Sequence, residues 1–222
     1  MVKGAFIRLD ESFLVPIPKV IEFQYNPEKL SRSFEPHSKQ AKDDTKMWDP
    51  LVEPFDPAES VVLELELDAT DALEEPDTHL AERISGIAGR IGALESLLYP
   101  AKEDALKSMT FGLLGKDSKV DPTKVPVVLF WWGVNRLVPV RFESFSVKEE
   151  AFSPLLAPIR AKVDVTLRVI TDEEMADWGK EPSSPEMWAK AAYQYTKKCR
   201  EGVATAAGYA DKASSVFGGL PF

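Results

Sequence analysis

The chain has 222 residues, of which 44% are hydrophobic and 10% aromatic, enough for one large domain with a substantial core. Its formal net charge of -9 argues against a nucleic-acid-binding protein, because such proteins normally carry a basic footprint. A single cysteine excludes an intrachain disulfide framework, and no apolar run is long enough to cross a bilayer. We therefore expect a protein that folds in the cytoplasm without direct membrane insertion.

The stretch VIEFQYNPEKLSRSF, residues 20–34, combines a predicted strand with a turn. β-Branched and aromatic residues favour a strand at its start, and Asn26-Pro27 interrupts that strand. We expect the polar run after the turn, which contains Arg32, to lead towards a neighbouring subunit.

Residues 35–58 are rich in Pro, Asp and Lys and predict a long loop. Its aromatic residues, Trp48 among them, indicate more than a solvated connection. Contact with a partner and a lid that packs its own aromatics are equally compatible with this composition. A second irregular segment, residues 101–124, contains GLLGKDSK, whose glycine spacing does not fit a phosphate-binding loop.

The segment SVVLELELDAT, residues 60–70, has the alternation of a half-buried strand. Its outward row consists of Glu64, Glu66 and Asp68. A second alternating segment, residues 159–169, has the outward basic residues Arg160, Lys162 and Arg168. We predict that the two rows pair across strands or between subunits, although a simple solvated face is the alternative.

Further strands and a helix are predicted between these two segments. Residues 125–133 form an apolar run typical of a central buried strand, and residues 137–147 change their apolar phase near Ser144, as at a bulge. Pro139 argues for an edge position or a strand start. Residues 79–98 predict a helix with one apolar stripe, ending in Leu94 and Leu98.

The predicted helix contains Gly86, Gly89 and Gly92, and these glycines indicate close approach to another backbone or simple tolerance. After an acidic, irregular stretch, Ser184-Pro185 predicts the start of an Ala-rich C-terminal helix. We expect its stripe to include Trp188, Ala192, Tyr195 and Cys199, and we expect Gly202 and Gly208 to break or loosen the helix.

No catalytic or metal site is apparent in the sequence. Neither His37 nor His79 belongs to a metal-ligand pattern, and Cys199 lies among basic residues in the Ala-rich helix, where a packing role is expected. The acidic row at residues 64–68 leaves a glycosidase pair open by spacing alone. We expect no cofactor, no metal and no enzymatic activity.

Three motifs occur in an order that resembles the tube-like domain of contractile injection system proteins: FQYNPEKLSRS at residues 23–33, FWWG at 130–133 and FSPLLAPIRAKV at 152–163. The resemblance covers roughly residues 3–170. It implies a mainly β (α+β) fold, a tail-tube-like antiparallel β-sandwich or barrel with one flanking helix. A C-terminal helical extension follows. We divide the chain into a β-domain at 1–171, with loop insertions at 35–58 and 101–124, and an acidic linker with a helical tail at 172–222.

The resemblance also implies a role. Such proteins form homo-oligomeric rings, usually hexamers, that join the inner tube to the spike, hub and other baseplate proteins of a phage-tail-like particle. The LysM module of many relatives has no counterpart after Ile170, which puts peptidoglycan binding in doubt. A peptidoglycan- or glycan-binding accessory protein and a ring at the cap end of the tube stay open as alternatives. The candidate assembly contacts are Asn26, Pro27, Arg32, Trp48, Glu64, Glu66, Arg160, Lys162, Arg168 and Trp188.

Overall fold

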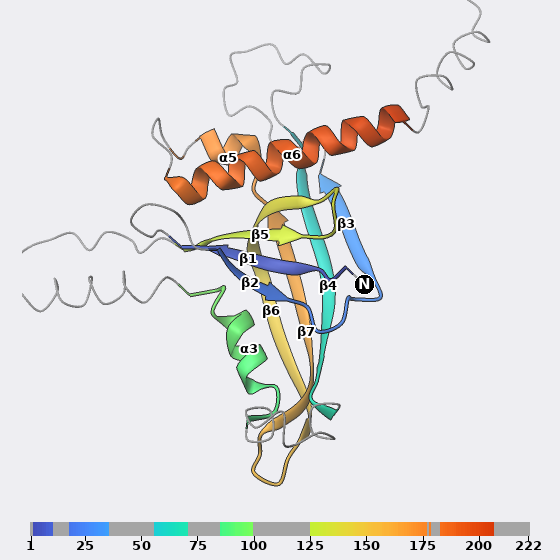
Figure 1. Ribbon diagram of the computed structural model, residues 1–222, viewed down its shortest axis with the longest axis vertical. Coiled ribbons are helices and arrows are strands. Elements are labelled where there is room, and N and C mark those ends of the chain that lie inside the picture. The colour runs from blue at the N-terminus through green and yellow to red at the C-terminus, as the bar shows by residue number, and fades with distance from the viewer. Residues whose placement is uncertain are drawn as a thin grey trace, which may run out of the picture.

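A computed structural model describes residues 2–10, 18–35, 56–70, 85–99, 125–176, 178 and 183–206 (Figure 1). Seven strands form one antiparallel sheet with the order β2-β1-β5-β6-β7-β4-β3. This arrangement confirms the predicted mainly β class with added helices. The elements are β1 (Ala5–Leu9), β2 (Pro18–Glu22), β3 (Leu30–Glu35), β4 (Ala58–Asp68), α3 (Ala88–Glu95), β5 (Val127–Trp131), β6 (Leu137–Phe152), β7 (Pro158–Val169), α5 (Asp172–Ala176) and α6 (Ser184–Ala206).

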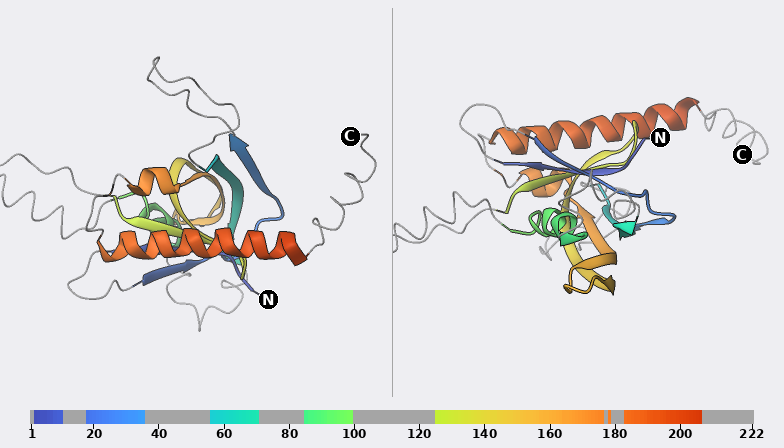
Figure 2. Two further views of the ribbon diagram at one scale, coloured as in Figure 1. Left: turned by 90° about the horizontal axis from the view of Figure 1, so that it is seen from above. Right: turned by 60° about the horizontal axis from the view of Figure 1, so that its bottom comes forward.

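The long strands β4, β6 and β7 run along the molecule, and β1, β2 and β5 cross them at one end (Figures 1 and 2). The sheet thereby curls around the larger of two buried hydrophobic clusters. Phe6 lies in the centre of this core, with its ring centroid 5.0 Å from that of Phe23 and 5.3 Å from that of Phe142. Edge-to-face packing at these distances fixes the crossing strands against the long ones.

The alternation predicted for β4 and β7 is confirmed residue by residue. Val61, Leu63 and Leu65 of β4 are buried, and so are Val163 and Val165 of β7, whereas the residues between them face outward. β5 is an interior strand, as its continuous apolar run predicted. The half-buried periodicity of the sequence therefore identified the centre of the sheet correctly.

β6 differs from its prediction in one respect. Its register with β7 shifts between Phe142 and Ser144, which confirms the bulge. Pro139 lies near the start of β6, as predicted, but β6 is an interior strand between β5 and β7, so an edge position is wrong. The carbonyl of Pro139 accepts a hydrogen bond from the N–H of Ile170, and its missing N–H is tolerated where the strand begins.

The helix predicted at residues 79–98 is described from residue 85 onwards and is interrupted. Gly86 has a φ of +55°, outside the helical region, and α3 begins only after it. A Cβ at Gly86 would lie 1.9 Å from the carbonyl oxygen of Pro158, so only glycine fits this position. The close approach to another backbone that was predicted for the three glycines is therefore found at Gly86 alone. A Cβ added at Gly89 or Gly92 would have no described atom outside the helix backbone within 4 Å. Tighter turns after α3 bury Leu97 instead of the expected Leu98.

α6 lies across the outside of the sheet at the end where the short strands cross (Figure 2). Ala189 and Ala192 pack on Leu9 and Leu129, and their small side chains allow close approach of the helix to the sheet. The helix begins at Ser184, as predicted, and continues through Gly202 to Ala206, so the break expected at Gly202 is wrong. Gly208 lies outside the described residues.

Of the stripe predicted for α6, Ala192 is buried as expected, but the rest of the buried face differs. Trp188 and Tyr195 are 56% and 44% exposed, whereas Ala189, Tyr193 and Thr196 are buried. The acidic stretch before α6 is not entirely irregular, because it contains α5. The division into two domains stays a prediction. Of the first loop insertion, residues 35–58, the structure describes only the two ends. The second insertion, together with Trp48, His37 and His79, lies outside the described residues.

Candidate assembly surfaces

The outward face of β4 and β7 carries the charge row that the sequence predicted, and its pairs form within one chain. Arg160 lies 2.8 Å from Asp68, and Lys162 lies 3.3 Å from Glu64 and 3.4 Å from Glu66. Antiparallel register places Glu66 opposite Lys162 and Asp68 opposite Arg160. Cross-strand pairing of these residues is therefore confirmed.

The third predicted basic residue has a different partner. Arg168 is opposite Ser60 in the register, and its guanidinium bonds Glu174 of α5 instead of the acidic row. Pairing of Arg168 with the acidic row is therefore wrong, because the register places that row further along β4. The ion pair with Glu174 joins the end of β7 to the segment that leads to α6.

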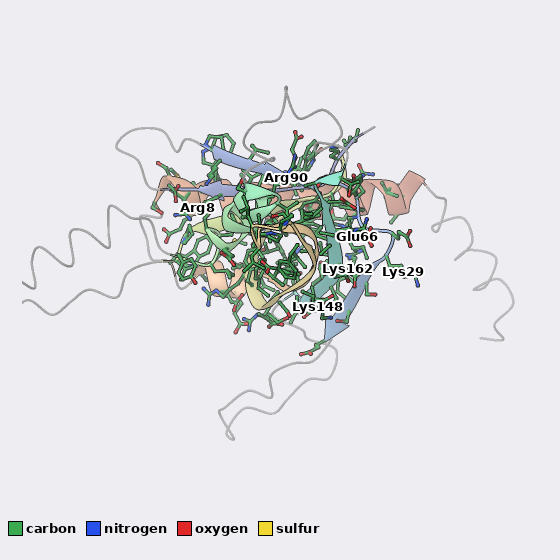
Figure 3. All side chains as sticks on the ribbon, turned by 90° about the horizontal axis from the view of Figure 1, so that it is seen from below. Arg8, Lys29, Glu66, Arg90, Lys148 and Lys162 are labelled. Carbon is green, nitrogen blue, oxygen red and sulfur yellow. The ribbon has the colours of Figure 1, made fainter. Side chains whose placement is uncertain are left out.

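The row continues onto β6, where Lys148 lies 2.7 Å from Asp164 of β7 (Figure 3). Hydrogen bonds that the Lys162 ammonium donates to Glu64 and Glu66 raise the pKa of Lys162, and the bond that Lys148 donates to Asp164 raises the pKa of Lys148. These side chains are exposed, so their pairs add little stability. The outward face of β4, β6 and β7 is therefore a solvent-exposed surface on which each of these carboxylates forms an ion pair with a lysine or arginine.

The connection between β2 and β3 contains Asn26 and crosses from one edge of the sheet to the other. The side-chain oxygen of Asn26 accepts a hydrogen bond of 2.8 Å from the N–H of Gly4, and its amide nitrogen donates to the carbonyl of Val2 at 2.9 Å. Both polar groups of Asn26 therefore act within the chain. Pro27 lines a pocket of 360 Å³ together with Glu64 and Glu66, which brings these predicted contacts to one surface.

Gln24, in the same connection, joins the segment after β2 to the end of β4. Its side-chain amide donates to the carbonyl of Asp68 and accepts from the N–H of Asp68, as a backbone amide would. The side chain of Asp68 is separately bonded: partial burial alone would raise its pKa, but hydrogen bonds from Thr70 and Arg160 lower that pKa. No sequence signal pointed to Gln24, because one polar residue in a strand-like run is typical of a solvated position.

Arg32 belongs to a charged cluster that the sequence did not reveal. Its guanidinium lies 2.7 Å from one carboxylate oxygen of Glu59, and Arg200 of α6 lies 2.6 Å from the other. The Glu59 side chain is only 4% exposed. Both guanidinium groups also lie over the ring of Phe34, at 4.9 and 5.9 Å from its centroid. This cluster joins β3, β4 and α6.

A second set of polar contacts holds α6 beside this cluster. Asp56 accepts hydrogen bonds from Lys197 at 2.8 Å and from the hydroxyl of Tyr193 at 2.9 Å. Burial and the bond to Asp56 raise the pKa of Tyr193. Thr196 bonds the backbone N–H and carbonyl of Leu137 through its hydroxyl. Polar side chains at helical spacing thus attach α6 to the sheet. A prediction based on apolar residues alone therefore did not identify this part of the buried face.

The described residues contain no arrangement typical of a catalytic or metal site. No three His, Cys, Asp or Glu side chains among them could together hold a metal ion. Cys199 is half-buried and free, and Trp188 is exposed on α6, where its predicted assembly contact stays a prediction. No helix within the described ranges has the length and apolar character needed to span a membrane.

Comparison with known proteins agrees with this architecture. The family model for contractile injection system tube proteins matches residues 9–177, which include every strand from β2 to β7. A search of curated proteins gives no match. The match spans more than half of the chain, and α6 begins after its end. The chain therefore belongs to the family of contractile injection system tube proteins.

Proposed function

We propose that this chain is a non-enzymatic structural subunit of a contractile injection particle, which forms a homo-oligomeric ring between the inner tube and the spike or hub. The observation that carries this proposal is the pair of open sheet edges. β2 and β3 end the sheet at opposite sides and pair with no further described strand. Unpaired edges of this kind recruit a strand from another chain.

Joining β3 of one subunit to β2 of the next is a heterologous contact, which closes into a ring when the rotation permits. Such a ring repeats the charged outward face of β4, β6 and β7 in every subunit. We propose six copies in the ring, with neighbours in the inner tube and baseplate, as the resemblance in the sequence implies. The particle is expected to assemble in the cytoplasm. A ring at the cap end of the tube is the second candidate, because α6 lies outside the family match and marks a subunit with an added surface.

Edge pairing is tested with Val20→Lys in β2, where the valine is 51% exposed. A lysine on an edge strand disfavours addition of another strand while leaving the fold intact. Negative-stain microscopy of the purified protein should show rings for the wild type and isolated subunits for the variant. The matched control is Val134→Lys, at a valine that is 76% exposed in the turn between β5 and β6, and it should keep the rings. Rings that persist in Val20→Lys would contradict the proposal.

The role in the particle needs a separate experiment. Deletion of the chain from a producing strain should abolish sheathed particles if it forms a baseplate ring. Particles with open or overlong tubes would favour the cap end. Binding of the purified chain to isolated peptidoglycan would favour the accessory-protein alternative. Normal contractile particles after deletion would contradict a required structural role.

A further inference from the structure

α6 runs across the subunit from one side of the sheet to the other. Near its start, Ala189 packs with Leu9 of β1, the strand beside the edge strand β2. Further along, Arg200 bonds Glu59, which also bonds Arg32 of the edge strand β3. The helix thus lies across the ends of the long strands (Figure 1). In a ring closed through β3 and β2, the end of α6 in one subunit is therefore directed towards the start of α6 in the next.

The last described turn of α6 projects beyond the sheet. Residues 201–205 are all exposed, although five consecutive residues occupy every side of a helix with 3.6 residues per turn. A helical turn that lay on its own sheet would bury one side. Among the described residues, the side chains of this turn bond only within the helix, as the hydroxyl of Thr205 does to the carbonyl of Glu201. This projecting turn carries Val203, which is 54% exposed.

The start of α6 carries an exposed apolar pair. Met187 and Trp188 are 52% and 56% exposed, although the next residue, Ala189, is completely buried against the sheet. Burial of a tryptophan removes a large apolar area from water, and tryptophan is enriched among the residues that contribute most to protein interfaces. The two ends of α6 thus each present apolar side chains to a neighbour.

The two ends of the α5–α6 segment also differ in charge. Its start has four acidic residues against two basic ones, Lys190 and Arg168, and the acidic residues are Asp172, Glu173, Glu174 and Glu186. The end of α6 has Lys197, Lys198 and Arg200 against one acidic residue, Glu201. Opposite charge favours contact between the end of one helix and the start of another over contact between two like ends.

We propose that the projecting turn of α6 packs Val203 against Met187 and Trp188 of the next subunit in the ring. This contact is heterologous, as a closed ring requires, and every subunit contributes both of its sides. The 23 residues of α6 span about 35 Å, so the helices form a continuous belt around one rim of the ring. The inference rests on the proposed ring and adds to it an interface from a helix that lies outside the family match.

The test is a disulfide cross-link. The variant carries Met187→Cys and Val203→Cys on a Cys199→Ser background. Within one chain the two new cysteines are 16 residues apart on one helix, about 24 Å, which is too far for a disulfide. Mild oxidation of the rings should therefore link most subunits to their neighbours, and a non-reducing gel should show a ladder of covalent oligomers up to the full ring.

The matched control is Val134→Cys with Val203→Cys on the same background. Val134 is 76% exposed, and its carbonyl accepts a hydrogen bond from Tyr195 in the middle of α6, away from both ends of the helix. This control should cross-link at least about fivefold less, because disulfides need Cα atoms within about 7 Å. Val203→Cys alone should give no covalent dimers, since two projecting turns do not meet in a head-to-tail contact.

A second measurement tests the apolar contact itself. Trp188→Glu should raise the protein concentration at which rings assemble by at least about tenfold. In the Val20→Lys background, which forms no rings, Trp188→Glu should leave the free energy of unfolding unchanged. A lower value there would overturn the inference, because Trp188 would then pack within its own chain.

Rings that give no ladder with Met187→Cys and Val203→Cys would overturn the belt and leave the ring intact. Covalent dimers from Val203→Cys alone would also overturn it, because two like ends would then be in contact. Failure of the wild type to form rings would contradict the proposed function itself.

Discussion

Gly86 is the position where one methyl group should cost the most stability. Its φ of +55° lies in the left-handed region, where an alanine costs about 1–2 kcal/mol. The added Cβ would lie 1.9 Å from the Pro158 carbonyl oxygen, which is backbone and cannot turn away as a side chain can. Relief of that contact would separate the Ile87 N–H from the same oxygen, now 2.9 Å away, for a further loss of about 1 kcal/mol. We therefore expect Gly86→Ala to lower the free energy of unfolding by about 3 kcal/mol.

Urea denaturation followed by tryptophan fluorescence measures this difference. The matched control is Gly89→Ala, because Gly89 lies inside α3 and an added methyl group there would have no described atom within 4 Å. In the control, the higher helix propensity of alanine should raise the free energy of unfolding by up to about 1 kcal/mol. The two glycines thus predict opposite signs for one chemical change. A neutral or stabilising Gly86→Ala would refute the assignment of this glycine to a close backbone contact.

Three further predictions concern the polar contacts. Glu59→Gln should lower the free energy of unfolding by about 2–3 kcal/mol, which is less than a fully buried ion pair would lose because both arginines reach solvent. A double-mutant cycle with Arg200→Met should show coupling, and additive effects would contradict direct pairing. Gln24→Ala should cost about 1–3 kcal/mol in the same assay, since the N–H and carbonyl of Asp68 lose their partner, and an unchanged midpoint would show that water replaces the amide. Asp56 is partly buried, but bonds from Lys197 and Tyr193 lower its pKa below 3.8, so its contribution is complete above that value and is lost as the pH falls through the lower folded pKa. The stability difference between the wild type and Asp56→Asn should accordingly shrink in acid, and a constant difference from about pH 7 to about pH 2.5 would contradict this account.

The sheet could be predicted from the sequence because its strands obey simple periodicity. In β4 and β7, alternate burial follows directly from alternate apolar residues, and the charged partners between them follow from the register. The bulge at Ser144 was visible for the same reason, since one extra residue moves the apolar phase to the other parity.

The contacts that complete the fold could not be predicted in this way. α6 is held by Thr196, Arg200 and Lys197, and a search for an apolar stripe therefore selected exposed Trp188 and Tyr195. Pairing of these polar groups depends on strand ends far away in the chain, as for Thr196 with Leu137, which are 59 positions apart. Local pattern indicates which residues can be buried, whereas it does not indicate which distant partner satisfies a polar one.

The strand order also constrains how the chain folds during synthesis. β1 and β2 are made first, but β1 takes its place in the sheet only beside β5, which is made much later. β4 likewise waits for β7, whereas β6 and β7 are joined by a short turn and can pair at once. β1 can pair with β2, and β3 with β4, as soon as both are made, but the other edges of β1 and β4 stay unpaired until β5 and β7 emerge, because long-range pairings form slowly. The last strand to be synthesised, β7, is therefore the one that joins β3 and β4 to the rest of the sheet, and premature pairing between the free edges of nascent copies is the hazard that this order creates.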